Sequence, residues 1–266
     1  MTKLHRLSQN SKWSVLYRKS EQVILGLIGL VCVVLLWQVT AHFEWINPLF
    51  ISSPKLVLDA AIEQSTNGII WAHFRITVVE FFLAFTIASI MGILIGMLMG
   101  WYRLVEYTLE PFIWLLYSSP FIAFYPLFII WLGLGFATVV MIGFLLAFIP
   151  IIVNTIAGVK GTNSVLIRAG HSFGANNRQI LLKIVLPSAL PMIVSGLRIG
   201  VERALIGVIV GEMFASTKGL GYLISYYGSR LHTDRLLVSV VLVVLFGLVL
   251  TQFMRLVEDR LLKWQK

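Results

Sequence analysis

Long apolar runs separated by short polar segments organise this sequence of 266 residues. A helix needs about 20 mostly apolar residues to cross the hydrocarbon core of a membrane. The stretch 111–159 holds no charged residue, and as one helix it would be roughly 74 Å long, which exceeds a single crossing. We therefore place a break at Gly133-Leu134-Gly135. The pattern predicts an all-α integral membrane protein with six transmembrane helices, at about 23–40, 78–102, 111–132, 136–158, 187–215 and 236–256.

Basic residues are concentrated on one side of these spans. Fourteen Lys and Arg residues fall in the leader, the C-terminal end and the two loops on their side, whereas five fall in the opposite loops. Because positively charged loops stay in the cytoplasm, we predict a basic cytoplasmic leader at 1–22, a membrane domain at 23–256 and a cytoplasmic tail at 257–266. The net charge of +9 in a chain that is 58% hydrophobic then follows from topology, and it indicates contact with lipid and not with nucleic acid.

The polar segment between the first two spans contains one short helix. Ser53 followed by Pro54 is typical of an N-cap with proline at the first helical position. Lys55, Asp59 and Glu63 recur every four residues and share one face. We predict an amphipathic helix on the outer membrane surface, either a plain connector or a contact for a delivery protein.

A second polar segment, 159–186, separates the fourth and fifth spans and lies on the cytoplasmic side of the predicted topology. Ser164–Phe173 has helix-compatible composition, and Gly174 suits the left-handed position that ends a helix. Asn176 or Asn177 can cap a second helix. We predict a helix, a tight glycine turn and a second helix, with the fifth span starting at Pro187.

The same segment resembles the "EAA" loop of binding-protein-dependent ABC transporter permeases, whose pattern is roughly E-A-A-x-x-x-G, about nine residues, then I-x-L-P. The spacing and the glycine agree, but the first position departs, because Arg168 stands where the family has glutamate, and Gly170 replaces the second alanine. In that family this loop couples the permease to an ATPase. The resemblance assigns that role to Arg168, Ala169, Gly170, His171, Ser172, Phe173, Gly174, Ala175, Leu186 and Pro187, with polar contacts that differ from the family's at Arg168.

The resemblance covers most of residues 45–263. Within the family, the sequence is most similar to permeases of the nitrate, sulfonate, taurine and bicarbonate type. Matching segments occur in order at 48–58, 126–135, 150–155, 186–191, 196–198 and 219–222. It implies a permease subunit of an importer in a bacterial cytoplasmic (inner) membrane, paired with a second permease copy, two ATP-binding subunits and an external substrate-binding protein. The sequence has no G-x-x-x-x-G-K-[ST] phosphate loop, so ATP and Mg²⁺ are expected on the separate ATP-binding subunit. The cargo implied is a small anion such as nitrate, a sulfonate, taurine or bicarbonate, while neutral aromatic or heterocyclic nutrients stay open.

The fifth span carries four charged residues. Charges inside a span are costly and face water, a partner or a pathway. The spacing allows Arg198 to pair with Glu202 on one helix face. We interpret this set as a candidate pathway or gate, with purely structural pairing as the alternative, formed by Arg198, Glu202, Arg203 and Glu212.

Small residues recur every fourth position on two spans. Such stripes let helices approach closely in lipid. We expect internal helix packing, with a homodimer seam through the fifth span as the alternative, at Gly92, Gly96, Gly100, Gly196, Gly200, Gly207 and Gly211.

Two other classes of protein are weighed against a permease. A secondary transporter driven by an ion gradient needs intramembrane acids and often two related halves, and no internal repeat is visible. A membrane enzyme needs a polar catalytic cluster at a membrane face, and none is visible. We therefore predict a transporter subunit with no catalytic residue, no metal site and no cofactor of its own.

Overall fold

The computed structural model describes residues 24–26, 28–29, 31–41, 43, 47 and 50–263, and within them every regular element is a helix, which confirms the all-α prediction. The leader 1–22, the end of the tail at 264–266 and Pro48 lie outside the described residues. A first helix spans Ile24–Ala41. It is followed by α2 (Pro54–Thr66), α3 (Ile69–Trp101), α4 (Arg103–Ser118), η1 (Phe121–Phe124), α5 (Tyr125–Leu132), α6 (Phe136–Lys160), α7 (Ser164–Ser172), α8 (Asn177–Ile180), η2 (Leu181–Val185), α9 (Leu186–Ala215), α10 (Leu220–Gly228) and α11 (Thr233–Leu261).

Five helices among the described residues are long and apolar enough to cross a membrane. They are Ile24–Ala41, α3, α6, the continuous helix Asn177–Ala215 and α11. A sixth crossing is counted only if α4 and the η1–α5 segment form one broken span, because the two are bent by 87°.

The predicted third span, 111–132, is not one straight helix. Helix α4 begins earlier, at Arg103, and the backbone turns extended at Ser119, with φ −81° and ψ 133°. The reason is Pro120, which disfavours a helical conformation at the residue before it and has no N–H to continue the hydrogen-bond ladder. The predicted span is thus a bent segment, formed by the end of α4 and by η1 and α5.

The fifth apolar helix does not start at Pro187 but continues from Asn177 without a break. The wider π-turn η2 precedes the proline, and the N–H of Leu186 reaches back to the carbonyl of Leu181. A π-turn accommodates the missing proline N–H inside a helix. The consequence is one continuous helix that joins the polar segment to the membrane core.

The core of the molecule is formed by α3, α6 and α9, whose buried side chains make one cluster. The predicted glycine stripes lie in these interfaces. A Cβ atom on Gly96 of α3 would lie 2.6 Å from Cβ of Thr155 in α6, and a Cβ on Gly207 of α9 would lie 2.8 Å from Cα of Gly143 in α6. The other stripe glycines face α6 in the same way, at Gly92, Gly100, Gly196, Gly200 and Gly211. The stripes therefore pack inside the chain, which leaves none of them free for a homodimer seam.

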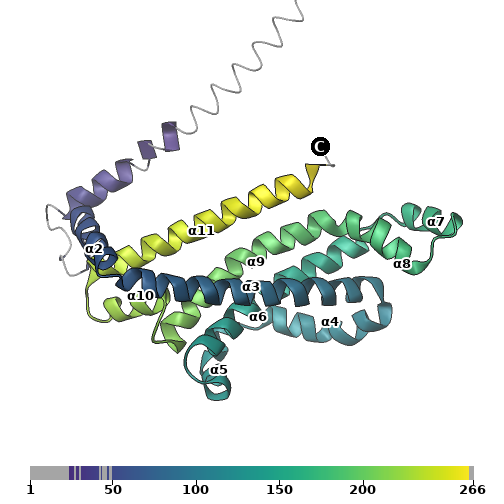
Figure 1. Cartoon of the computed structure of the whole chain (residues 1–266), viewed down its shortest axis with the longest axis horizontal. Coiled ribbons are helices and arrows are strands. Elements are labelled where there is room, and N and C mark those ends of the chain that lie inside the picture. The colour runs from purple at the N-terminus through teal and green to yellow at the C-terminus, as the bar shows by residue number, and fades with distance from the viewer. Residues whose placement is uncertain are drawn as a thin grey trace, which may run out of the picture.

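The two ends of this helix core differ. Helices α2 and α10 lie at one end, whereas α7 and α8 project from the opposite end, where α11 also terminates (Figure 1). As predicted, Ser53 caps α2, with its side chain accepting the N–H of Leu56 at 3.3 Å.

Candidate functional site

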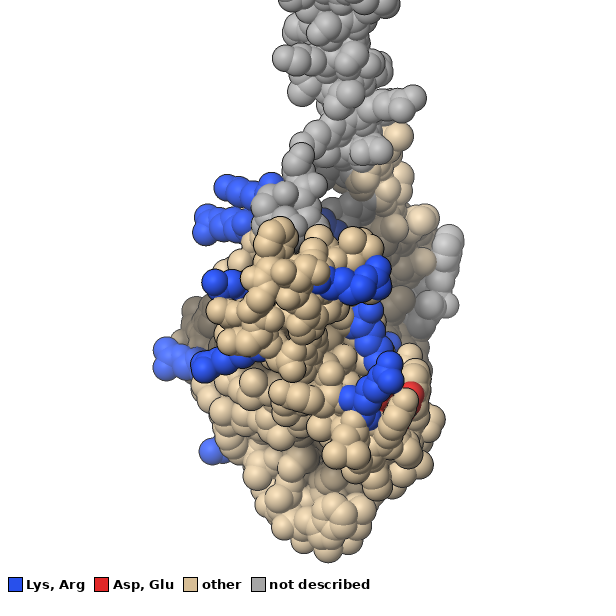
Figure 2. All heavy atoms as spheres, turned by 90° about the vertical axis from the view of Figure 1, so that its right-hand side faces the viewer, with Lys and Arg blue, Asp and Glu red and all other residues tan. Residues whose placement is uncertain are grey.

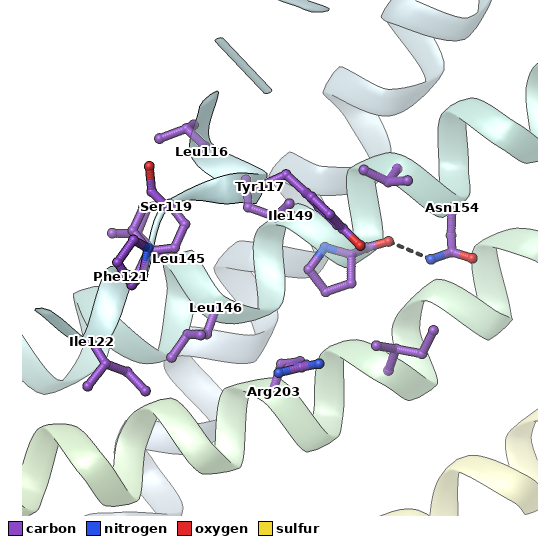
Figure 3. Close-up of a pocket in the computed structure, with 14 residues that line it drawn as sticks. Leu116, Tyr117, Ser119, Phe121, Ile122, Leu145, Leu146, Ile149, Asn154 and Arg203 are labelled. Carbon is purple, nitrogen blue, oxygen red and sulfur yellow. Dashed lines mark hydrogen bonds between the residues drawn. The ribbon is translucent and has the colours of Figure 1, made fainter. Parts of the chain in front are cut away.

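A pocket of about 600 Å³ lies at the middle depth of α6 and α9, under the break between α4 and η1. Its walls are mostly aliphatic and aromatic (Figure 3). Three elements contribute polar side chains: Tyr117 and Ser119 come from the end of α4, Asn154 from α6 and Arg203 from α9. Binding pockets for small molecules have this composition, with apolar walls and a few polar groups that orient the ligand.

Arg203 supplies a cation to this pocket. Its guanidinium group has no hydrogen bond or ion pair with any described residue, and it can only donate hydrogen bonds. Nearby, the side-chain amide of Asn154 donates to the carbonyl of Pro150 at 2.8 Å. Pro150 has no N–H, so the carbonyl of Leu146, which lines the same pocket, lacks its helical donor. A bound anion with additional hydrogen-bond donors would satisfy both groups.

Glu202 and Arg203 are exposed on the surface of the single chain at the middle of α9. Charged groups at this depth are not left in contact with hydrocarbon. This face of α9 must therefore border water or another chain. Arg198, in contrast, does not pair with Glu202 as its spacing allows, because its Nη1 donates to Oε2 of Glu258 in α11 at 3.0 Å.

Glu212, which the sequence places with the pathway residues, is completely buried at 0% exposure. Its carboxylate accepts the hydroxyl of Thr77 at 2.6 Å and the N–H of Gly221 at 2.7 Å. Thr77 in turn accepts the N–H of Leu220 at 2.9 Å, and His73 Nδ1 accepts that of Gly219 at 3.0 Å. In this conformation Glu212 holds the start of α10 against α3 and α9, and it does not line the pocket that contains Arg203.

The projecting segment 159–186 has a fixed local shape. Asn163 caps α7 by accepting the N–H of Val165 at 2.8 Å. Asn176 and Gln179 form a reciprocal capping box at the start of α8. Between the helices Gly174 adopts φ +76°, a left-handed conformation that glycine tolerates and other residues resist. The chain therefore makes a tight helix–turn–helix at the glycine that the sequence singled out.

The apolar residues of this segment divide into two groups. Ile180 and Ile184 pack inward, and a Cβ atom on Gly170 would lie 2.8 Å from Cδ1 of Ile184. An alanine at this position, as in the family pattern, would require the flexible tip of Ile184 to shift. Val165 and Phe173 point outward, with Phe173 91% exposed at the tip.

The surface around α7 and α8 is basic. Figure 2 shows Lys and Arg spread over this face, with very little acidic surface visible. Arg168, Arg178 and Lys183 are exposed on it. Farther in, Lys160 pairs with Glu106 of α4.

Several residues of these sites were not found from the sequence. The pocket residues Tyr117 and Ser119 are remote in sequence from Arg203, and only the bend at Pro120 brings them near it. Packing also brings hydrogen-bond partners from other helices to α9 and to the start of α10, namely Thr77, His73 and Glu258. Asn154 lies in one of the matched segments, which was the one available signal.

Comparison with known proteins supports a single family. Residues 88–263 match the family described as binding-protein-dependent transport system inner membrane component. The taurine transport system permease protein TauC of Escherichia coli is 33% identical over 98% of this chain and 96% of its own length. A putative ABC transporter permease of Methanocaldococcus jannaschii is 34% identical over 93% of this chain and 94% of its own. A putative aliphatic sulfonates transport permease protein, SsuC of Bacillus subtilis, is 28% identical over 93% of this chain and 90% of its own.

The fold has a solved counterpart. An inward-facing structure of the MetNI methionine ABC transporter superposes with a TM-score of 0.57, at 19% identity, over 83% of this chain and 99% of that chain. At this identity the match concerns the fold alone. The family match spans more than half of the sequence, and the relatives are transport components and not enzymes. This chain belongs to the family of inner-membrane components of binding-protein-dependent transport systems, and it is a permease subunit of an ABC transporter.

Proposed function

We propose that this permease forms the import pathway for a small solute with an anionic group, with a sulfonate such as taurine as the first candidate. Arg203 supports this, since a guanidinium fork can donate two parallel hydrogen bonds to two oxygens of a sulfonate, carboxylate or similar anion. The printed functions of TauC and SsuC, for taurine and for aliphatic sulfonates, favour the sulfonate among the anions expected from the sequence.

The single observation that carries the coupling mechanism is the continuity of the helix Asn177–Ala215. Its first turn belongs to the projecting segment with Gly174, and its middle carries Arg203. A force applied to α7 and α8 is thereby transmitted along one continuous helix to the pocket. We assign the segment 159–186 as the coupling loop, which docks on an ATP-binding subunit.

The assembly that we propose contains two permease copies, two ATP-binding subunits and an external binding protein. ATP and Mg²⁺ bind to the ATP-binding subunits. The exposed pair Glu202 and Arg203 supports a second permease copy, because that copy and the water-filled pathway between the two would cover charges that lipid cannot accommodate. The glycine stripes are used inside the chain, so the contact between copies lies elsewhere than on these glycines.

The orientation follows from charge. The end of the molecule with α7, α8 and the C-terminal end of α11 is basic (Figure 2), and basic ends face the cytoplasm. The opposite end, with α2 and α10, then faces outward and receives the binding protein. A transporter driven by an ion gradient finds no support in the family match.

Purification and reconstitution test this function. The chain expressed with its cognate ATP-binding subunit should copurify with it, hydrolyse ATP only in that complex, and take up labelled taurine into proteoliposomes when the binding protein and ATP are present. Active uptake by the chain alone, driven by an ion gradient, would refute the proposal. ATP-dependent uptake of another solute, without uptake of any sulfonate, would support the ATP-driven mechanism and exclude a sulfonate as the substrate.

A further inference from the structure

The coupling loop carries exposed cations without an acid of its own. No aspartate or glutamate occurs between Glu110 and Glu202, so α7 and α8 contribute only positive charge to their surface. The Arg168 side chain is held by one hydrogen bond, from its Nη1 to Oγ of Ser164 at 3.3 Å. Among the described residues it has no carboxylate partner. The remaining N–H groups of its guanidinium are therefore available to an acceptor outside this chain.

Arg168 stands beside an apolar contact surface. Val165 lies one turn before it on α7 and is 57% exposed, and Phe173 projects from the C-terminal end of the same helix. A shallow hollow between α7 and the start of α9, next to Phe173, carries Lys183 at its edge. The complement of this surface is a groove with an apolar floor and a negatively charged rim.

A protein groove fits this surface better than lipid headgroups do. Both helices are capped, and the turn is fixed by Gly174 in the left-handed conformation. The segment also projects beyond the ends of α3 and α4 (Figure 1). A preorganised shape of this kind contributes to affinity only when the partner has a matching shape, and a fluid headgroup layer has none.

We propose that the ATP-binding subunit that serves this permease carries carboxylate groups on the rim of its docking groove, opposite Arg168. This inference rests on the assignment of α7 and α8 as the coupling loop. Arginine pairs with carboxylates through two parallel hydrogen bonds, which gives directional specificity as well as attraction. A groove with a cation at that place would meet Arg168 with like charge, so Arg168 selects against ATP-binding subunits built for an acidic coupling loop.

Charge-reversal variants of Arg168 in the complete complex test the proposal. Arg168→Glu should weaken retention of the cognate ATP-binding subunit by about tenfold or more, because like charges then meet across the contact. Arg168→Lys should retain the ATP-binding subunit nearly as well as the unmodified chain does. The matched control is Arg103→Glu, an exposed arginine at the same end of the molecule but on α4. Affinity should fall with salt for the unmodified chain and much less for Arg168→Glu.

The outcomes of these experiments distinguish the charge proposal for Arg168 from the coupling assignment on which it rests. A partner carboxylate found by crosslinking near position 168 and then changed to arginine should restore binding to Arg168→Glu. If the ATP-binding subunit binds but Arg168→Glu binds and transports as well as the unmodified chain, the charge proposal is refuted and the coupling assignment stands. If Arg168→Glu changes only the binding of the complex to phosphatidylglycerol vesicles, relative to phosphatidylcholine vesicles, Arg168 serves the membrane and the proposal is again refuted. Failure of any ATP-binding subunit to bind the unmodified chain would instead refute the proposed function.

Discussion

The carboxylate of Glu212 accepts the backbone N–H of Gly221 at 2.7 Å, which ties the C-terminal end of α9 to the start of α10. Neither glycine beside this carboxylate leaves room for a larger residue, since a Cβ atom on Gly219 or Gly221 would collide with the Glu212 side chain. The first amides of a helix have no partner within the helix. Glu212, Thr77 and His73 satisfy three of the amides at this end, so they determine how α10 docks.

Removing this acceptor should destabilise the permease. Glu212→Ala leaves buried donors without partners, at a cost of about 1–3 kcal/mol. Glu212→Gln keeps one acceptor oxygen and should cost less. The measurement is thermal unfolding of the purified complex in detergent, with exposed Asp59→Asn on α2 as the control. Equal melting temperatures for Glu212→Ala and the control would contradict the structural role of this side chain.

The contact between α6 and α9 should not tolerate even one added carbon. In Gly207→Ala the new Cβ would meet the backbone of Gly143 at 2.8 Å, and the helices must separate, at about 1–3 kcal/mol. In Gly247→Ala of α11 the nearest atom is the flexible Cδ2 of Leu205 at 3.1 Å, so this variant is the matched control. Folded yield and melting temperature should fall for Gly207→Ala alone. A normal yield of Gly207→Ala would show that the packing is looser than described.

Arg203 should control how well an anionic substrate is transported. A charge-assisted hydrogen bond contributes about 1.5–3 kcal/mol, so Arg203→Ala should lower transport efficiency by about tenfold or more. The transport efficiency of Arg203→Lys should lie between those of Arg203→Ala and the unmodified chain, because lysine keeps the charge and loses the planar fork. Uptake of labelled taurine into proteoliposomes measures this, with exposed Arg255→Ala as the control. Unchanged uptake by Arg203→Ala would exclude this residue from the pathway.

The C-terminus should lie in the cytoplasm. A reporter fused after Lys266 should be active only in the cytoplasmic state, since the basic end of the molecule is retained there. A reporter inserted at Gly68, between α2 and α3 at the opposite end, should register outside. A reversal of the two signals would overturn the orientation and the coupling assignment with it.

The apolar pattern predicted the helical class and most of the spans, because length and hydropathy report membrane crossing directly. It did not reveal the bend at Pro120, where the charge-free run continues without interruption although the backbone turns by 87° between α4 and η1–α5. It also did not reveal that the helix continues on the N-terminal side of Pro187, through the π-turn η2. Hydropathy contains no information about either the bend at Pro120 or the π-turn before Pro187.

The candidate sites were predicted unequally. Gly174 was found because a left-handed turn needs glycine, which is a local requirement. The contacts of Glu212 could not be predicted, since its partners lie at Thr77 and at the start of α10, and only packing brings them together. Arg198 was matched with the nearest acid in sequence, whereas Glu258 is its partner in space. Local signals are visible in a single sequence, and long-range pairings are not.

The most direct test of the account is transport by a variant of Gly174 in the assembled complex. Gly174→Leu imposes about 1–2 kcal/mol of left-handed strain on the coupling turn, and nothing lies within 4 Å of the new Cβ to clash with it. Gly68→Leu is the matched control, with φ +71°, equally empty surroundings and a place at the opposite end. The account predicts that both variants reach the membrane, that Gly68→Leu transports normally, and that Gly174→Leu loses ATP-driven uptake. Normal uptake by Gly174→Leu would contradict it.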